Sequence, residues 1–163
     1  MIGDREGYRD IVLNSCSLQS ILHIWEGDFP DEASRKEGFR ICMWVVDNMC
    51  RYRPNWHYME PVFKMLPMFL THNDPLLLKE CCWAAARILH AAGRYPSIDE
   101  MITPSFCNRL VQILAQNNMM TTHPLLRAMI NLTSSKNLSH LEVTAFSLIT
   151  SILFKLESFE NWS

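Results

Sequence analysis

Hydrophobic residues recur along most of the chain at the three- and four-residue spacing typical of amphipathic helices. Two apolar segments, residues 8–13 and 18–25, predict a short helix followed by a longer one. Glycine, proline and acidic residues then crowd into residues 27–34, which predicts a loop. The first part of the chain is therefore expected to be two helices and a loop that leads into a third helix.

That third helix is predicted over residues 35–52. Ser34 and Glu37 match a capping box, in which the serine caps the third helical amide and the glutamate reaches back. The helix is expected to end before Pro54, because the residue that precedes a proline is biased away from helical geometry.

A second unit of three helices follows, predicted over 59–64, 65–70 and 75–91. Its last helix has the strongest start signal in the chain. Asp74 can cap free amides, and Pro75 at the first helical position loses no hydrogen bond.

A third unit is predicted as helices over 97–102, 105–115 and 123–133, the last of them opened by Pro124 in the same way. Beyond it, residues 138–156 form a strongly apolar helical stretch that resembles the start of a fourth unit.

The last helices of the three units carry the same two slots, four residues apart. The pairs are Trp44 and Asn48, Trp83 and Arg87, and Arg127 and Asn131. Repeats of about 40 to 47 residues made of helices are the signature of HEAT and armadillo solenoids. The repeat predicts an all-α protein.

A tryptophan and an asparagine four residues apart share one helix face and can form a docking unit. The indole of Trp44 can flank the stem of a lysine or arginine, and the amide of Asn48 can bind an extended peptide backbone. For an isolated pair, a core tryptophan beside a surface asparagine is the commoner interpretation. The partial recurrence favours docking here.

Composition narrows the function classes. The 163 residues are 48% hydrophobic and 20% charged, enough for one sizeable core. A net charge of −2 with scattered basic residues argues against nucleic-acid binding. Six cysteines without a C-x-x-C pair suit a reducing compartment, and the absence of a long apolar run predicts no membrane span.

Catalytic and metal-binding motifs are not evident. The histidines lie far apart without an H-x-x-x-H pair, and no glycine-rich phosphate loop occurs. Cys81 and Cys82 are neighbours on a predicted helix and therefore point to different faces, so packing is the favoured role and redox chemistry the alternative. We expect no enzyme activity, no metal and no cofactor.

Several sequence blocks together resemble importin alpha, the armadillo-repeat adaptor of nuclear import. They are residues 7–12, 44–51, 66–67, 73–75, 82–84 and 126–131. They occur in the family's order and at close to its spacing, and the likeness spans nearly the whole chain. The similar region starts at the end of the family's third repeat and stops inside its seventh.

The resemblance implies a right-handed superhelix of three-helix armadillo repeats, whose third helices line a concave groove for a basic nuclear localisation signal. The chain is expected to be a single domain, residues 1–163. Its repeat-like units are about 8–53, 55–93 and 94–135, with a partial unit at 137–163.

The same resemblance assigns the residues that bind the cargo signal. They are Trp44, Asn48, Glu80, Trp83, Arg127 and Asn131. Trp44 and Asn48 match the pair in the larger, N-terminal signal site, and Asn131 matches a residue near the smaller, C-terminal site.

Asp47 and Arg87 are candidate modulators of that site. Asp47 becomes part of a field that attracts a basic peptide only if it faces a shared groove. Arg87 stands where the family usually has a tyrosine, and its charge would repel a basic ligand.

We therefore expect an adaptor of the cytoplasm and nucleus that binds basic localisation-signal peptides, without nucleic acid or membrane partners. The basic segment that recruits importin beta in the family is absent, which argues against that partner. The alternative is a degenerate armadillo scaffold that binds proteins without recognising a signal. The adaptor hypothesis requires Trp44, Asn48 and Asn131 to face solvent.

Overall fold

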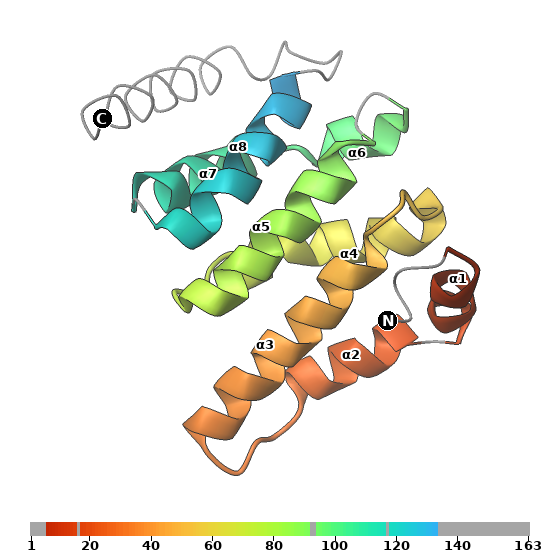
Figure 1. Cartoon of the computed structure of the whole chain (residues 1–163), viewed down its shortest axis with the longest axis vertical. Helices are drawn as coiled ribbons and strands as arrows, with labels where there is room; N and C mark the ends of the chain where they lie inside the picture. Colours follow the sequence, from red (N-terminus) through yellow and green to blue (C-terminus); the bar gives the residue numbers. More distant parts are fainter. Residues whose placement is uncertain (1–5, 16, 92–93, 117, 134–163) are drawn as a thin grey trace.

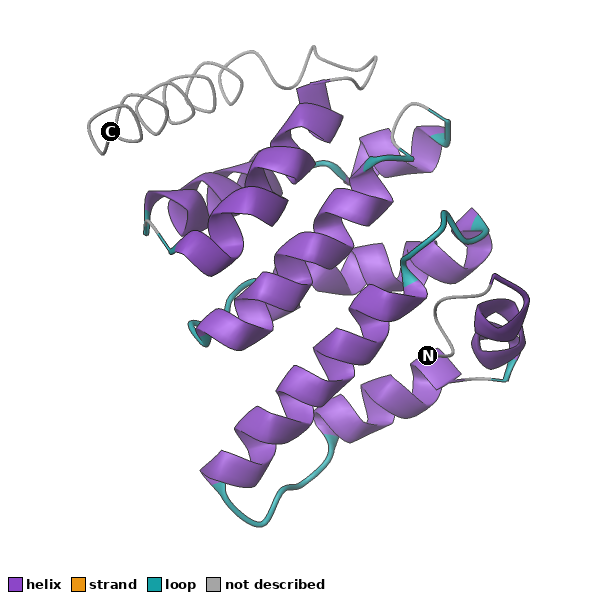
Figure 2. Ribbon diagram, viewed as in Figure 1, coloured by secondary structure: helices purple, strands orange, loops and turns teal. Residues whose placement is uncertain are grey.

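A computed structural model describes residues 6–15, 17–91, 94–116 and 118–133. Within these ranges the chain forms eight α-helices and no strand, which confirms the predicted all-α class (Figure 2). The helices are α1 (Glu6–Asn14), α2 (Ser17–Glu26), α3 (Glu32–Met49), α4 (Trp56–Phe69), α5 (Pro75–Leu89), α6 (Pro96–Met101), α7 (Pro104–Ala115) and α8 (Met119–Thr133). The predicted helix over 138–156 and the partial unit at 137–163 lie outside the described residues.

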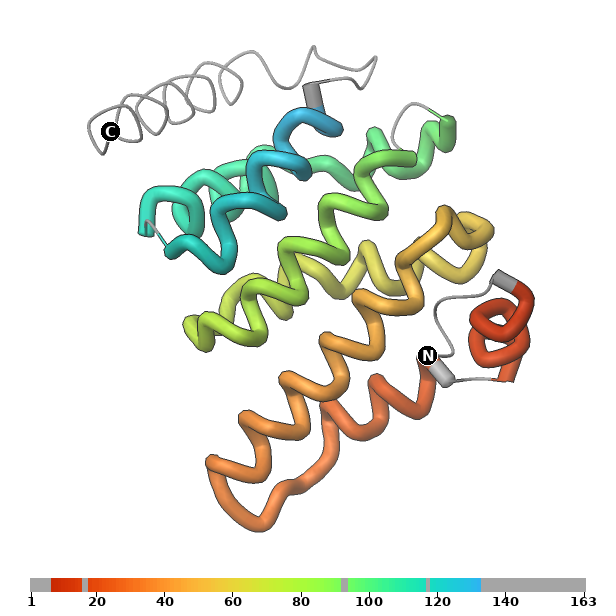
Figure 3. The backbone as a smooth tube through the Cα atoms, viewed as in Figure 1, coloured from red at the N-terminus to blue at the C-terminus, as the bar shows by residue number. Residues whose placement is uncertain are grey.

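Three helices, α3, α5 and α8, lie side by side and run in the same direction (Figures 1 and 3). Helix α5 is the middle one and packs against both of the others. Helices α2, α4 and α7 each pack against a member of this row. The row therefore consists of the last helix of each predicted unit.

Small side chains let α5 fit between its two neighbours. Ala84, Ala85 and Ala86 are all buried, with at most 3% of their surface exposed. The distance between packed helix axes depends on the side chains at the contact, so alanines allow α3 and α8 to approach closely. Larger leucines of α5, Leu77, Leu78 and Leu89, are also buried.

Aromatic rings from α2, α3 and α4 pack against one another. Trp25 stacks on Phe39 with ring centroids 3.8 Å apart and meets Phe69 at 4.3 Å. Offset and tilted ring pairs of this kind contribute about 0.5–1.5 kcal/mol beyond the area that they bury. The cluster anchors α3, which carries Trp44 and Asn48.

Helix α3 begins three residues earlier than the sequence pattern predicts. Its cap is Asp31, whose carboxylate accepts a hydrogen bond from the Ser34 amide at 2.7 Å. Ser34 therefore lies inside the first turn, and the predicted capping box with Glu37 is wrong. An aspartate three residues upstream provides the same kind of acceptor and begins the helix first.

Helix α4 is continuous, whereas two short helices were expected over 59–64 and 65–70. Pro61 and Pro67 both lie within it on exposed positions. Each proline removes one backbone hydrogen bond, and on an exposed face water can bind the carbonyl that is left over. An uninterrupted buried stripe, which includes Met59, Val62 and Leu66, keeps the two halves in one helix.

Helix α8 starts at Met119, not at His123. Asn118 supplies the start, because its side-chain oxygen accepts from the Met120 amide at 2.9 Å. The hydroxyls of Thr121 and Thr122 donate to the Asn118 carbonyl at 3.1 and 2.9 Å. Pro124 therefore lies inside the helix, and the expected proline start is wrong. The corresponding prediction for α5 is confirmed, since the Asp74 carboxylate accepts from the amides of residues 76 and 77.

No helix of the described residues is long and apolar enough to cross a membrane.

Candidate functional site

The three parallel helices present a common face on which the repeated positions line up. Residues at i and i+4 lie on one side of a helix, which places Trp44 with Asn48 on α3, Trp83 with Arg87 on α5, and Arg127 with Asn131 on α8. Arg51 and His90 follow just beyond the ends of α3 and α5. We call this surface the ladder face. Its Trp83, Arg87, His90, Arg127 and Asn131 side chains line a single cavity.

Trp44 is the more exposed of the two tryptophans on the ladder face. Its side chain is 48% exposed, although it lies well inside an 18-residue helix. Asn48, one turn further on, is half-buried and donates from its amide to the Trp44 carbonyl at 2.8 Å. The indole is therefore available to a ligand, and the carboxamide oxygen of Asn48 is not used by that hydrogen bond.

Asp47 and Arg87 form an ion pair that joins α3 to α5. Arg87 donates to the Asp47 carboxylate and, at 2.9 Å, to the Asp47 backbone carbonyl. Only 3% of the Asp47 side chain is exposed, compared with 23% for Arg87. Asp47 is therefore buried and neutralised within the fold, and it does not face an open groove.

The same guanidinium covers the ring of Trp83. The Arg87 Cζ atom lies 5.3 Å from the ring centroid, and His123 meets the ring edge-on at the same centroid distance. Burial, and then the nearby charge of Arg127, hold the pKa of Arg87 below its usual value. Trp83 thus binds a cation from its own helix, on the ring that was expected to flank a basic ligand.

The second slot of each pair has a structural partner. Arg87 donates to a carbonyl in the last turn of α3, and Asn131 donates to the Ala86 carbonyl of α5 at 2.8 Å. These two side chains reach back to the preceding helix of the row and bond to carbonyls that also accept hydrogen bonds from the backbone amides of Cys50 and His90. The amide of Asn131 therefore fixes α8 against α5, and the residue is half-buried where the adaptor hypothesis requires it to face solvent.

The remaining predicted residues, Glu80 and Arg127, differ in burial and in ion pairing. Glu80 is largely buried and pairs with Lys79 at 3.0 Å. Arg127 is exposed and forms no ion pair within the part of the chain that the structure describes. The predicted site is thus split between an exposed indole on α3 and a basic region over α5 and α8.

The cavity over α5 and α8 has a volume of about 860 Å³. Arg51, Tyr52 and Arg53, from the turn that follows α3, also line it and were not predicted. Arg51 lies seven residues after Trp44, and this spacing could have identified it as a residue of the same face. Arg53 gave no such signal, because its position depends on a left-handed backbone at residues 52 and 53.

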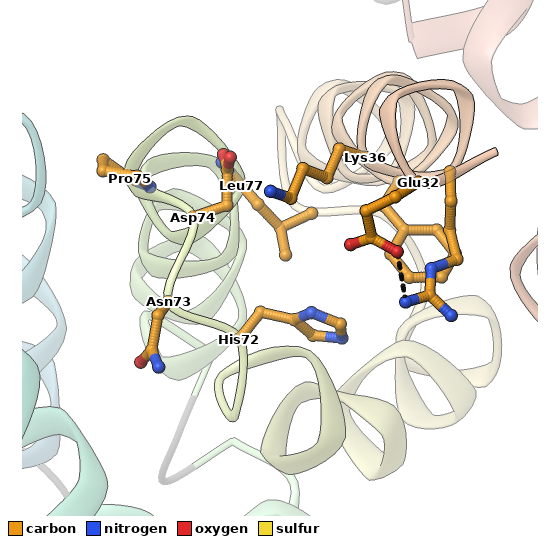
Figure 4. A pocket seen from close by; sticks show the side chains of 9 residues that line it. Glu32, Lys36, His72, Asn73, Asp74, Pro75 and Leu77 are labelled. Atoms are coloured by element: carbon orange, nitrogen blue, oxygen red, sulfur yellow. Dashed lines mark hydrogen bonds and ion pairs between the residues drawn. The ribbon is translucent and has the colours of Figure 1, made fainter.

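A second cavity of about 390 Å³ opens between the start of α3 and the loop that precedes α5 (Figure 4). His72 points into it, and Lys36 extends over it from α3. Burial, with Arg35 as the next cause, keeps the pKa of His72 below its usual value. The imidazole packs edge-on against Trp25 and Phe39 at 5.4 Å, so its place in the aromatic cluster accounts for its burial.

The described residues contain no group of three or more histidine, cysteine or acidic side chains that could hold a metal ion. Cys42, Cys50, Cys81, Cys82 and Cys107 are all buried and unpaired as disulfides. Burial raises the pKa of the Cys50 and Cys82 thiols to about 12, which opposes formation of the reactive thiolate. Neither a scan of protein-family models nor a search of curated proteins finds a match to this chain.

Proposed function

We propose that this chain is an armadillo-type adaptor, similar to importin alpha, which binds an extended basic localisation signal of another protein at Trp44 and Asn48. The observation that carries the proposal is the exposed indole of Trp44 on the ladder face, one helical turn from Asn48. An indole that is half exposed well inside a packed helix is available to flank the stem of a ligand lysine. No catalytic step and no cofactor are needed for this role.

The parallel row of α3, α5 and α8 supports an armadillo arrangement. The three helices recur at the repeat length of HEAT and armadillo proteins and present equivalent positions on one face. Extended peptides bind along such faces because every repeat adds similar side chains at a regular spacing. An import adaptor of this kind would act in the cytoplasm and nucleus.

The proposed affinity is low. Binding energy at interfaces concentrates in a few anchors, each worth roughly 2 kcal/mol or more on truncation. Trp44 is one such anchor, whereas Trp83 is covered by Arg87. We therefore expect a dissociation constant of about millimolar to high micromolar for a lysine-rich peptide.

A second candidate is a scaffold that binds proteins through the ladder face without recognising a basic signal. The ion pair between Arg87 and Asp47 favours it, because the chain's own arginine takes the carboxylate that would attract a ligand lysine. The two candidates differ in the charge that the ligand must carry.

A peptide titration separates them. A fluorescent lysine-rich peptide is titrated with the purified chain, alongside a peptide of the same length in which glutamine replaces lysine. The test variant is Trp44→Ala. The control is Ile24→Ala, which removes an apolar side chain of α2 that is 47% exposed, almost the same fraction as Trp44.

The adaptor proposal expects saturable binding of the lysine peptide that Trp44→Ala lowers about fivefold or more and that Ile24→Ala leaves unchanged. Equal binding of the glutamine peptide would favour the scaffold. No loss of binding in Trp44→Ala would refute the proposed site.

A further inference from the structure

The cavity over α5 and α8 has a charge opposite to the one that a basic ligand needs. Four arginines line it, Arg51, Arg53, Arg87 and Arg127, together with His90. None of the described residues that line it is an aspartate or glutamate. Asp47 neutralises Arg87 from the helix interior and is not itself a lining residue. We call this surface the arginine cavity.

Arg53 and Arg127 form no ion pair with any of the described residues, and no acidic side chain among these residues lines the cavity. Burial, and then the positive charge of Arg127, keep the pKa of Arg87 below its usual value, as expected for two cations that line the same cavity. Arg53 donates to the Nε2 atom of His90 over 2.6 Å, a contact that requires this nitrogen to carry no proton. An anion between these groups would relieve the repulsion.

Strained backbone helps to build the cavity. Tyr52 and Arg53 have φ angles of 57° and 52°, in the left-handed region that favours glycine. Such residues are sterically strained and persist only where the surroundings hold them. Here the turn directs the Arg53 guanidinium from the end of α3 to His90 on α5.

The chemistry of the lining selects carboxylates on a peptide. Guanidinium groups bind carboxylates through paired hydrogen bonds. Apolar surface adjoins them, because Tyr52 and Ile130 also line the cavity and are 53% and 60% exposed. A nucleic acid fits less well, since the chain has a net charge of −2 and a long phosphate backbone needs an extended basic surface.

We infer that the arginine cavity binds an acidic segment of a protein partner, with Arg53 and Arg127 as its main carboxylate contacts. This site is separate from the proposed signal site at Trp44. It uses the other end of the ladder face and a ligand of opposite charge, so either site can be present without the other.

The test is fluorescence anisotropy with a labelled peptide that carries six glutamates, compared with the same peptide carrying six glutamines. The test variants are Arg127→Gln and Arg53→Gln. The control is Arg35→Gln, which removes the same charge from the far end of α3, where Arg35 forms a surface ion pair with Glu32. Circular dichroism confirms that each variant is folded.

The inference expects the glutamate peptide to bind, Arg127→Gln and Arg53→Gln each to weaken it about fivefold or more, and Arg35→Gln to change it less than about twofold. Trp44→Ala is expected to leave this binding intact, which separates it from the signal site. Equal losses in Arg35→Gln and Arg127→Gln, or binding of the glutamine peptide, would overturn the inference. Stronger competition by single-stranded RNA of equal charge than by unlabelled glutamate peptide would also overturn it.

Discussion

Arg87 on α5 crosses to α3 and neutralises Asp47, which is buried there. The two residues are 40 positions apart in the sequence, so the pair exists only because α3 and α5 pack side by side. The same guanidinium lies over the ring of Trp83. One side chain therefore neutralises the buried Asp47 and also covers the Trp83 ring, which could otherwise attract a cation.

Removing Arg87 should lower the free energy of unfolding more than removing the charge of Asp47. Arg87→Ala leaves the buried Asp47 carboxylate without a counter-charge and is expected to cost about 3–5 kcal/mol of unfolding free energy. Asp47→Asn is expected to cost about 1–2 kcal/mol, because Arg87 keeps its bond to the backbone carbonyl of residue 47. Urea denaturation measures both.

The double variant provides the control. In the Arg87→Ala background, Asp47→Asn should recover part of the lost stability, since it removes the unpaired charge. A further loss in the double variant would show that the charge of Asp47 has another partner.

The charge of Asp74 should make stability depend on pH. The hydrogen bond from Arg40 is the main cause that holds the pKa of Asp74 below its usual value, and the two side chains approach to 2.5 Å. A carboxyl group whose pKa is lowered by folding stabilises the folded state above its unfolded pKa of about 3.9. That contribution is lost as the pH falls through the lower folded pKa.

Asp74→Asn isolates this effect, because asparagine is as good a helix cap as aspartate but does not titrate. The wild type should be more stable than Asp74→Asn at pH 6, and the difference should shrink toward zero as the pH is lowered below about 4. Thermal unfolding across this pH range measures it. A difference that stays constant would contradict the charge-based account.

Gly38 on α3 should respond to substitution according to the residue at position 29. A Cβ atom added to Gly38 would lie 2.5 Å from the Cε1 atom of Phe29, which is too close. Gly38→Ala is therefore expected to destabilise the wild type, because the Phe29 ring must leave its contact with Phe39.

In a Phe29→Ala background, the same substitution should stabilise the helix by up to about 1 kcal/mol, which is the helix preference of alanine over glycine. Denaturant unfolding of the wild type, the two single variants and the double variant shows whether Gly38→Ala stabilises or destabilises each background. Destabilisation in both backgrounds would place the constraint elsewhere than at Phe29.

The buried thiols should be inert in the folded protein. Burial raises the pKa of Cys50 and Cys82 to about 12 and of Cys107 to about 11, and also raises that of Cys42 and Cys81. The thiolate is the reactive form, so little of it exists at pH 8. A Cys16→Ser background removes the sixth cysteine, which lies outside the described residues.

In this background, a thiol-specific colorimetric reagent at pH 8 is expected to react slowly without denaturant and rapidly in guanidinium. Prompt reaction of one thiol in the native protein would show that its helix is not packed as described.

The sequence was sufficient for the elements whose signals lie within one or two turns. The apolar spacing predicted the all-α class, and Asp74 followed by Pro75 located the start of α5. The predicted helix start was wrong where an earlier residue in the sequence caps the helix. Asp31 preceded Ser34 in this way, and Asn118 preceded Pro124.

Continuity of α4 was decided by packing. The sequence pattern predicted two helices, over 59–64 and 65–70. The exposed positions of Pro61 and Pro67, with the buried stripe on the opposite face, determine that one helix forms. Exposure of a position depends on neighbouring helices, which a local pattern does not specify.

For the candidate site, the sequence by itself determined which residues share a helix face, since that follows from 3.6 residues per turn. It therefore placed Trp44 with Asn48 and Trp83 with Arg87. Only the tertiary structure decided that Trp44 is exposed, that Arg87 is bonded to Asp47, and that Arg53 reaches His90. The physical reason is the sequence distance between the interacting residues. Helix geometry relates residues up to about four apart, whereas these partners lie 37 and 40 residues apart and meet only after the helices pack together.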